Sequence, residues 1–317
     1  MADIVNEETA LARAIALVHA GQPVALPTET VYGLAADATN GAAVARIFEA
    51  KGRPRFNPLI VHVADRAMAE RIGRFDALSG KLADAFWPGP LTLVVPLVPD
   101  AKIHPLVTAG LASVGLRMPQ GFAARLIAAG GRPLAAPSAN SSGRISATTA
   151  TAVEADLGDR IALVVDGGPT PVGLESTIVK VERGGVRLLR PGGIAAEEIE
   201  AVLGVPLLRG DAGGIEAPGM MRSHYAPRAG LRLEADRVAP GEALLAFGPE
   251  RIAGADRAVM VLNLSPAGDL REAAANLFSH LQALDRSGAS VIAAEAVPAT
   301  GLGEAINDRL RRAAAPR

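Results

Sequence analysis

The amino-acid sequence predicts an α/β protein with two domains joined by a linker. Residues 1–207 alternate short apolar strand patterns with amphipathic helical patterns, which is typical of one mixed α/β domain. Residues 208–230 lose this periodicity and are rich in glycine and proline, which indicates an ordered or semi-ordered linker. Residues 231–317 again alternate strands with helices, which predicts a small parallel-sheet domain.

Two asparagines mark the predicted starts of the first two helices. Asn6 precedes two glutamates and an apolar face that ends at Gly21, and Asn40 can cap a helix that ends before Gly52. Strand patterns of the first domain cover 24–26, 59–63, 91–97, 114–118, 134–136, 163–165, 177–181 and 186–189. The second domain has strand patterns at 243–247, 259–262 and 291–294, a helix over 270–286 and a helix that ends near residue 312.

Composition excludes several classes of protein and site. The chain has no cysteine, which excludes disulfides, thiolate metal sites and a cysteine nucleophile. Its most apolar stretch, residues 86–98, is interrupted by three prolines and is therefore not a membrane span. The N-terminus is acidic rather than basic, unlike a secretory signal. We therefore expect a cytoplasmic protein with no membrane partner.

Charge favours a small-molecule enzyme over an RNA-binding module. The 32 basic residues are balanced by 33 acidic ones, whereas proteins that grip nucleic acid usually have a basic excess. Aromatic residues make up only 3% of the chain, so base-stacking platforms are scarce. An RNA-binding module without enzymatic activity stays as the alternative function, and salt-sensitive RNA affinity without turnover of a small molecule would favour it.

The common catalytic and nucleotide-binding motifs are missing. No Walker phosphate loop, no H-E-x-x-H pattern and no G-x-S-x-G elbow occurs in the sequence. The segment Gly301-Leu302-Gly303 begins a dinucleotide-like pattern, but a glycine-rich helix start is the better interpretation. If the protein uses ATP, it holds the nucleotide with other residues.

Polar clusters interrupt the apolar strands of the first domain. Segment 27–34 is dense in hydroxyls and follows a strand, which suits either a ligand site or a capping turn for a following helix. Lys51 and Arg53 suit phosphate oxygens, although for this cluster taken alone a solvated basic turn at a helix end is the favoured interpretation. His62 lies within a strand and, taken alone, is more often structural than catalytic.

Further polar residues follow other strands of the same domain. Arg117 ends a strand and can face a carboxylate, preferably with two hydrogen bonds. Segments 137–143, 175–177 and 190–192 add serines, an asparagine and an arginine at strand ends. This set of cations and hydroxyls suits a ligand with phosphates and an amino-acid carboxylate, and it contains no metal cage or nucleophile triad.

These residues fall in stretches that resemble the YrdC-like family, the threonylcarbamoyl-AMP synthases. The stretches are PTETVYGLAADA (27–38), KGRPRFNPLIVHV (51–63), WPGPLTLV (87–94), SVGLRMP (113–119), APSANSSG (136–143), ESTIVKV (175–181) and LLRPGGI (188–194). They occur in the family's order, and the segment APGMMRSHYAPRA (217–229) with the residues after it resembles the two-domain form. Alanine at 36 and serine at 113 are small departures that remove no charge.

The resemblance implies both a fold and a reaction. The fold is a twisted mixed sheet with a basic concave cavity, followed by a Rossmann-like parallel α/β domain. The reaction joins L-threonine, bicarbonate or CO2, and ATP into threonylcarbamoyl-AMP and pyrophosphate, which makes the enzyme a nucleotidyltransferase. Separate threonylcarbamoyl-transferase proteins then modify an adenosine next to the anticodon of tRNA, and the synthase itself has at most a weak contact with tRNA.

The resemblance also implies roles for individual residues. L-threonine is expected to contact Thr30, His62, Arg117, Ser138 and Ser176, with Arg117 on the carboxylate. ATP is expected to contact Lys51, Arg53, Asn57, Ser113, Asn140, Thr148, Arg190 and Tyr225, with Lys51 and Arg53 acting catalytically at the phosphates. Tyr32 is a weaker candidate. No metal ligand comes from protein side chains, and Mg2+ is expected to be held through the ATP phosphates.

Overall fold

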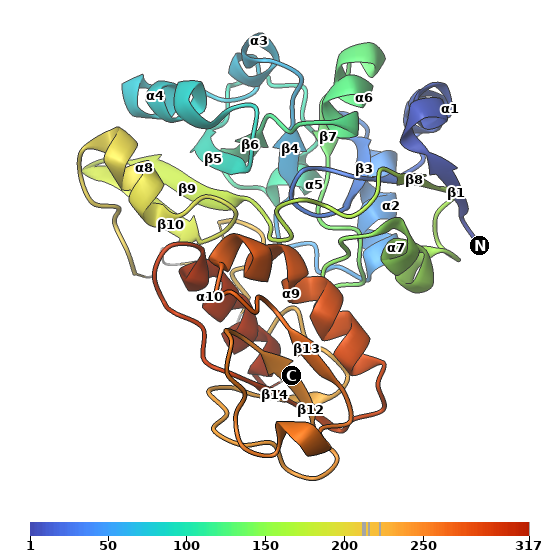
Figure 1. The fold of residues 1–317 in the computed structure, drawn as a ribbon. Helices are drawn as coiled ribbons and strands as arrows, with labels where there is room; N and C mark the ends of the chain where they lie inside the picture. Colours follow the sequence, from blue (N-terminus) through green and yellow to red (C-terminus); the bar gives the residue numbers. More distant parts are fainter. Residues whose placement is uncertain (211–213, 215, 222, 317) are drawn as a thin grey trace.

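The protein contains two separate β-sheets, each with its own strand order. A computed structural model describes residues 1–210, 214, 216–221 and 223–316. The predicted linker 208–230 therefore lies partly outside the described residues. Figure 1 shows the N-terminal part, which carries the large sheet, stacked on a smaller C-terminal part. Among the described residues, no helix combines the length and apolar character that a membrane crossing requires.

The large sheet is mixed and has the order β1-β8-β2-β3-β7-β4-β6-β5-β9-β10. Its strands are β1 (Asp3–Asn6), β2 (Val24–Leu26), β3 (Gly33–Asp37), β4 (Ile60–His62), β5 (Leu91–Pro96), β6 (Ser113–Arg117), β7 (Leu134–Ala135), β8 (Leu163–Asp166), β9 (Thr177–Glu182) and β10 (Gly185–Arg190). Strands β4 and β6 run parallel with His62 opposite Arg117, so both side chains leave the same face of the sheet.

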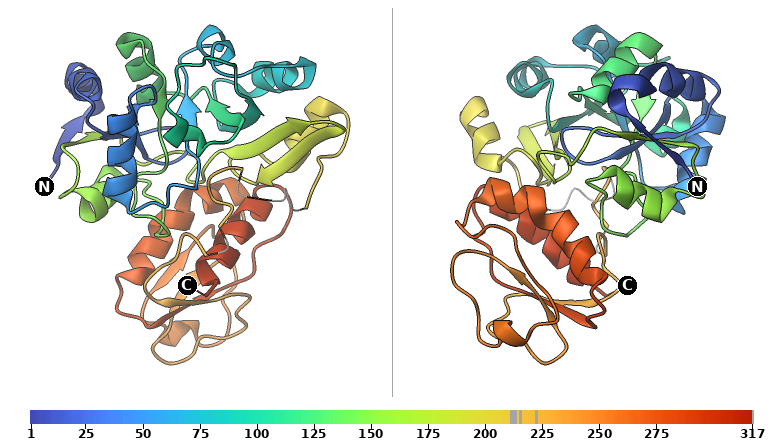
Figure 2. Two further views of the ribbon diagram at one scale, coloured as in Figure 1. Left: turned by 180° about the vertical axis from the view of Figure 1, so that it is seen from behind. Right: turned by 45° about the vertical axis from the view of Figure 1, so that its right-hand side comes forward.

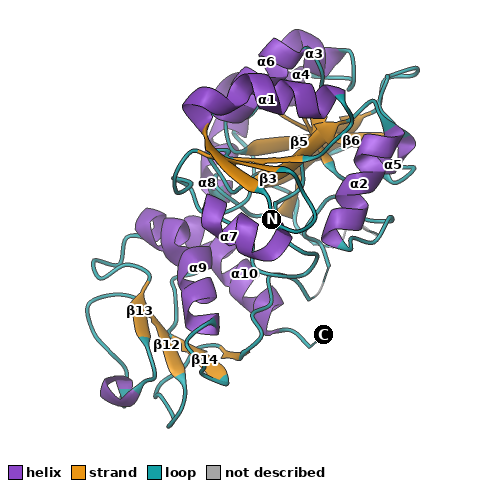
Figure 3. Ribbon diagram, turned by 90° about the vertical axis from the view of Figure 1, so that its right-hand side faces the viewer, coloured by secondary structure: helices purple, strands orange, loops and turns teal. Residues whose placement is uncertain are grey.

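Eight helices accompany this sheet in the described part of the chain. They are α1 (Glu7–His19), α2 (Gly41–Lys51), α3 (Arg66–Glu70), α4 (Ala77–Phe86), α5 (Pro105–Thr108), α6 (Phe122–Gly130), α7 (Ala150–Leu157) and α8 (Ala196–Leu203). The predicted caps are present, since the Asn6 side chain accepts from the backbone of Glu8 and the Asn40 side chain accepts from two backbone N–H groups. Figure 3 shows α1, α3, α4 and α6 on one side of the sheet.

The small sheet is parallel throughout its paired strands and has the order β11-β14-β12-β13. Its elements are β11 (Gly230–Arg232), β12 (Ala243–Ala246), a short 3-10 helix (Ala255–Arg257), β13 (Val261–Asn263), α9 (Leu270–Asp285), β14 (Val291–Ala294) and α10 (Leu302–Ala314). Helix α10 begins directly after Gly301, as the interpretation of 301–303 as a helix start predicts. The predicted fold class, a mixed sheet followed by a small parallel sheet, is confirmed.

The two parts share an apolar core at their junction. Helices α9 and α10 lie between the small sheet and the N-terminal part (Figures 2 and 3). One cluster of buried apolar residues joins Leu277 and Phe278 of α9 to Val31, Ile145 and Leu174 of the N-terminal part. Burying these side chains favours a fixed arrangement of the two parts, because apolar contact would be lost on separation.

Three strands lie where the sequence pattern does not predict them. Segment 33–37 forms β3, antiparallel to β2, so the loop after β2 turns a hairpin and does not cap a helix. This segment has no β-branched residue, and it is a strand because both neighbours in the sheet pair with it. Strands β1 and β11 are edge strands of the two sheets, where pairing with one distant strand decides the conformation.

Candidate functional site

A small enclosed cavity lies where several strands of the large sheet end. Its walls include Thr30, His62, Arg117, Ser138 and Ser176, which are all five residues predicted for L-threonine. Arg53, Arg190 and Tyr225 from the set predicted for ATP also line it. The space that the centres of water molecules can reach is about 40 Å³, so a few water molecules fit. A nucleotide with its phosphates needs more room.

Arg117 lies in the cavity wall, and part of its guanidinium is already hydrogen-bonded within the protein. Its Nη2 donates to Oε1 of Glu29 at 2.6 Å, and its Nε donates to the Gly89 carbonyl at 3.3 Å. Both partners of the ion pair are buried. Burial raises the pKa of Glu29, but the Arg117 charge and the backbone N–H of Gln120 outweigh it and leave this pKa lowered. Glu29 therefore stays ionised and holds the fork of Arg117 in place.

His62 stands beside Arg117 as a neutral imidazole. Burial, reinforced by the nearby Arg117 charge, lowers the pKa of His62 to about 3. Its Nδ1 is buried and has no hydrogen-bond partner among the described residues. A neutral ring with an unused nitrogen in a cavity wall is available to bind a polar ligand.

Lys51 ends α2 and is almost completely buried behind the Ser138 wall. Its Nζ donates to the carbonyl of Ser138 at 2.6 Å and also to the carbonyl of Asn140. Burial, with help from the Arg53 charge, lowers its pKa well below the usual value. A nearby anion would favour the charged form of this lysine.

Two arginines add positive charge on the same side of the cavity. Arg53 donates to the carbonyls of Asn57 at 3.3 Å and Pro58 at 2.9 Å, and burial lowers its pKa to about 10. Arg190 donates to the Ser176 carbonyl at 2.7 Å and to the Pro218 carbonyl at 3.2 Å. The Arg190 charge adds to burial in lowering the pKa of Arg53, so positive charge is concentrated here and suits an anion.

The segment between the two parts covers this cavity. Pro218, Gly219, His224 and Tyr225 all line it. Gly219 has φ +81°, and a Cβ there would stand 2.9 Å from both the Arg190 Cδ and the Tyr225 hydroxyl. Only glycine allows this close approach without displacing its neighbours. Burial lowers the pKa of His224 to about 3 and raises the pKa of Tyr225.

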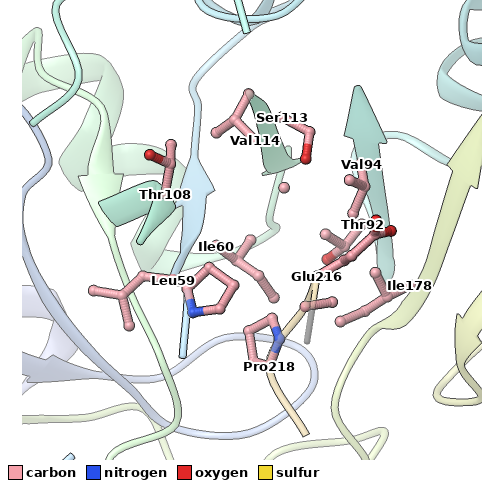
Figure 4. A pocket seen from close by; sticks show the side chains of 13 residues that line it. Leu59, Ile60, Thr92, Val94, Thr108, Ser113, Val114, Ile178, Glu216 and Pro218 are labelled. Atoms are coloured by element: carbon pink, nitrogen blue, oxygen red, sulfur yellow. The ribbon is translucent and has the colours of Figure 1, made fainter. Parts of the chain in front are cut away.

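Ser113 lines a second, neighbouring space that shares two wall residues with the first. Ile60 and Pro218 belong to both walls, and Thr92, Val94 and Ile178 complete much of the second one. Figure 4 shows Ser113 at one end of this space and Pro218 at the other. The space holds only about 10 Å³, so the chain segment that carries Pro218 fills it.

The remaining predicted residues lie near the cavity or away from it. Asn57 donates to the Met221 sulfur at 3.6 Å, and its buried Oδ1 has no partner within the described part of the chain. Asn140 donates to two neighbouring carbonyls and likewise keeps a free buried Oδ1. Thr148 is buried outside both cavity walls. Tyr32 is fully buried and donates to the Gly168 carbonyl at 2.9 Å, so its hydroxyl has a structural role.

Two carboxylates of the site escape prediction from the sequence. Glu29 holds Arg117, and Glu175 lines the cavity directly before Ser176. A signal for both was present, since each lies in a polar cluster at a strand end. Their partners are far away along the chain, so the sequence pattern alone does not show what they bind.

Comparisons with known proteins agree over nearly the whole chain. A sequence model of the Sua5/YciO/YrdC family, described as "Telomere recombination", matches residues 16–192. A model described as "Threonylcarbamoyl-AMP synthase, C-terminal domain" matches residues 194–315. A threonylcarbamoyl-AMP synthase of Bacillus subtilis is 42% identical over 99% of this chain and 96% of its own length. One of Pyrococcus abyssi is 42% identical over 97% of this chain and 94% of its own.

The fold is similar to a solved structure of the same kind. The crystal structure of Pyrococcus abyssi Sua5 complexed with L-threonine superposes with a TM-score of 0.88 and 38% sequence identity. The match covers 98% of this chain and 97% of that one.

Proposed function

The chain belongs to the threonylcarbamoyl-AMP synthase family, and on that premise we propose how its cavity joins L-threonine, bicarbonate or CO2, and ATP. The products are threonylcarbamoyl-AMP and pyrophosphate, so the enzyme is a nucleotidyltransferase. One observation carries the proposal, which is that the Arg117 and His62 wall adjoins the positive charge of Lys51, Arg53 and Arg190. A carboxylate subsite and a phosphate subsite therefore share one cavity.

L-threonine occupies the wall that is formed by the ends of β4 and β6. Arg117 binds its carboxylate with a guanidinium that Glu29 holds in position, which reduces the entropy lost on binding. The hydroxyls of Thr30, Ser138 and Ser176 bind its polar groups. Val31, Ile60 and Ala136 supply apolar surface in the same wall, and we assign the threonine methyl group to them.

ATP places its phosphates at the three cations. Lys51 provides a buried ammonium, and Arg53 and Arg190 provide planar donors. The charge of the bound phosphates favours the protonated form of Lys51, because an opposite charge offsets the cost of its burial. Asn57, Ser113, Asn140, Thr148 and Tyr225 are assigned to the remainder of the nucleotide and its immediate surroundings.

The reaction requires positioning and charge neutralisation, and it uses no covalent enzyme intermediate. The neutral amine of threonine forms a C–N bond with CO2 and loses a proton to solvent, which gives a carbamate. With bicarbonate as the source, the same C–N bond forms as a water molecule leaves. A carbamate oxygen then forms a bond to the α-phosphorus of ATP as the bond to the leaving pyrophosphate breaks. The free Nδ1 of His62 can accept a hydrogen bond from the amine, and the cations neutralise the charge on pyrophosphate.

Magnesium enters as part of the ATP substrate. Among the described residues, no three histidine, aspartate or glutamate side chains gather closely enough to hold a metal ion. Glu175 lines the cavity, but its oxygens accept from Ser146 at 2.5 Å and from Arg309 at 2.9 Å. Phosphate oxygens and water are the ligands that Mg2+ prefers in such sites.

The segment over the cavity acts as a lid that must open for substrates. Since the space open to water centres is about 40 Å³, ATP does not fit until the described lid residues, 217–221 and 223–225, move. Closure afterwards excludes water from a mixed anhydride that hydrolyses readily. We propose the division 1–207, 208–230 and 231–317 for the catalytic domain, the lid-bearing linker and the C-terminal domain.

The product serves tRNA modification in the cytoplasm. Threonylcarbamoyl-AMP is an activated acyl donor, so transferase proteins that modify an adenosine beside the anticodon are its consumers. The synthase needs no more than a weak contact with tRNA for this role.

Pyrophosphate release from ATP and Mg2+ tests the proposed function. L-threonine and bicarbonate are each supplied or omitted, and release should require both. Release that ignores both substrates, or no release at all, would contradict the assignment.

A further inference from the structure

Arg309 of α10 is a charged residue with no exposed surface. Its guanidinium reaches residues of the N-terminal part, where Glu175 and the Pro191 carbonyl accept its hydrogen bonds. Nε donates to Oε2 of Glu175 at 2.9 Å, and Nη1 donates to the Pro191 carbonyl at 2.9 Å and to Asp308 at 2.8 Å. Burying a guanidinium is costly unless its donors are bound, so its place here requires an explanation.

One side of Arg309 reaches the floor of the catalytic cavity. Glu175 lines that cavity and is followed by Ser176, which was assigned to L-threonine above. The second oxygen of Glu175 accepts from the Ser146 hydroxyl at 2.5 Å, and Gln282 of α9 donates to the Ser146 carbonyl at 3.2 Å. The C-terminal helices therefore hold both ends of the Ser146–Glu175 pair.

The other side of Arg309 reaches the lid. The guanidinium carbon of Arg309 lies 5.2 Å from the centre of the Tyr225 ring. The Phe278 ring of α9 also stacks on Tyr225, with the ring centres 5.5 Å apart. One turn further along α10, Arg312 donates to the Met221 carbonyl at 2.6 Å and accepts from the His224 backbone at 3.1 Å. The same helix therefore binds the cavity floor and the lid.

We propose that Arg309 is a positioning residue that couples lid closure to the geometry of the cavity floor. This inference rests on the proposed function. A closed lid puts Tyr225 against Arg309, which in turn fixes the Glu175 carboxylate and the start of β9 that carries Ser176. Nη2 of Arg309 is buried and has no hydrogen-bond partner among the described residues. The surroundings of Arg309 therefore leave one of its donors unsatisfied, which a purely structural role does not explain. The C-terminal domain thereby contributes to catalysis without touching substrate.

Arg309→Met tests the coupling, with Arg311→Met as the matched control. Arg311 is exposed on the same helix, and its side chain forms no hydrogen bond or ion pair with the residues that the structure describes. In R309M we expect kcat for pyrophosphate release to fall by up to about 100-fold with little change in the KM for L-threonine, because misplacement affects the reacting geometry. The ratio of threonylcarbamoyl-AMP recovered to pyrophosphate released should also fall, since an open lid admits water. R311M should match the unmodified protein in both.

A second variant keeps the test valid if R309M folds poorly. Glu175→Gln combined with Arg309→Met removes the unpaired carboxylate, so this double variant should unfold less readily than R309M. It should still show the lower product ratio. A folded R309M or double variant with unchanged kcat and product ratio would overturn the inference and reduce Arg309 to a structural role.

Backbone hydrogen exchange separates this inference from the proposed function. Amides of the described lid residues 223–226 should exchange faster in R309M than in R311M, whether or not the protein turns over ATP. If the unmodified protein released no pyrophosphate while this difference persisted, the proposed function would fail and the contact between Arg309 and the lid would stand. Equal exchange in the two variants would contradict the inference.

Discussion

Polar residues follow the strands in both sheets, but in the described structure they differ in how much of their hydrogen-bonding capacity is already used. At the ends of β4 and β6, His62 and Arg117 face enclosed space, and His62 keeps an unused nitrogen within the described structure. After β14 of the small sheet, Glu295 accepts from Arg251 at 2.8 Å and from the backbone of Phe247 at 2.8 Å and Ile252 at 3.1 Å. A polar residue at the end of a strand is therefore not enough to make a ligand-binding site. Hydrogen-bonding capacity must also be left open toward a cavity.

Side-chain hydrogen bonding explains the difference between the two sheets. Asn263, at the end of β13, donates to the Gly248 carbonyl at 3.0 Å, and its own oxygen accepts from the Ser265 backbone at 3.2 Å. These contacts tie the loop after β13 to the loop after β12. In the large sheet, by contrast, the Arg53 charge helps to lower the pKa of Lys51, and the Arg190 charge helps to lower that of Arg53. Such a concentration of charge costs stability and is retained where it binds an anion.

Lys51→Ala should give the largest effect, because it removes one of the cations assigned to the phosphates. We expect kcat/KM for pyrophosphate release to fall by about 1000-fold, the size of effect seen when a preorganised charge stabiliser is deleted. Steady-state kinetics measure it, with circular dichroism to show that the variant is folded. Full turnover by the variant would contradict the contrast between the two sheets, because the reaction would then not need Lys51 at the phosphates.

Acid should destabilise the cavity side of the molecule first. The pKa values of His62 and His224 are lowered to about 3, so the unfolded chain binds protons below its histidine pKa of about 6.5 while the folded chain does not. Stability is therefore present above that pKa and is lost as the pH falls toward 3. Each histidine should cost about 2 kcal/mol between pH 7 and pH 5.

Urea unfolding at pH 7 and pH 5 measures this loss. His62→Gln and His224→Gln should each reduce the dependence on pH, since each removes one of the groups that protonate on unfolding. A pH dependence unchanged in both variants would show that the acid sensitivity lies elsewhere.

Arg117→Lys separates charge from geometry at the carboxylate subsite. Lysine keeps the positive charge but cannot present a planar fork, so the KM for L-threonine should rise by about tenfold to 100-fold. Binding of L-threonine measured by calorimetry provides a check that does not depend on turnover. Unchanged threonine affinity would remove Arg117 from the subsite.

Glu295→Gln should give the smallest effect, and it should change stability and not activity. The amide keeps the shape but loses an ion pair and part of its hydrogen bonding, so the free energy of unfolding should fall by about 1–2 kcal/mol. The kcat for pyrophosphate release should not change, because Glu295 lies in the small sheet away from the cavity. A large loss of activity in a folded variant would mean that the small sheet also carries part of the site.

Local signals explain which elements could be predicted. Asn6 and Asn40 cap their helices with their own side chains, so the information lies within three residues of each helix start. Strand β3 contains glycine, leucine, two alanines and an aspartate, and no local preference indicates a strand. It pairs with β2 on one side and β7 on the other, and this pairing decides its conformation.

The sequence by itself determined the fold class and the family, because these depend on patterns that are short and contiguous. From the same patterns it predicts the five residues that we propose for the threonine subsite. Tertiary structure decided which charges meet. Glu29 and Arg117 are 88 positions apart, and Glu175 and Arg309 are 134 positions apart. A buried ion pair forms only where folding brings two groups out of water together, and its energy depends on that geometry. For that reason, the contact between the C-terminal helix and the cavity floor could be found only in the folded chain.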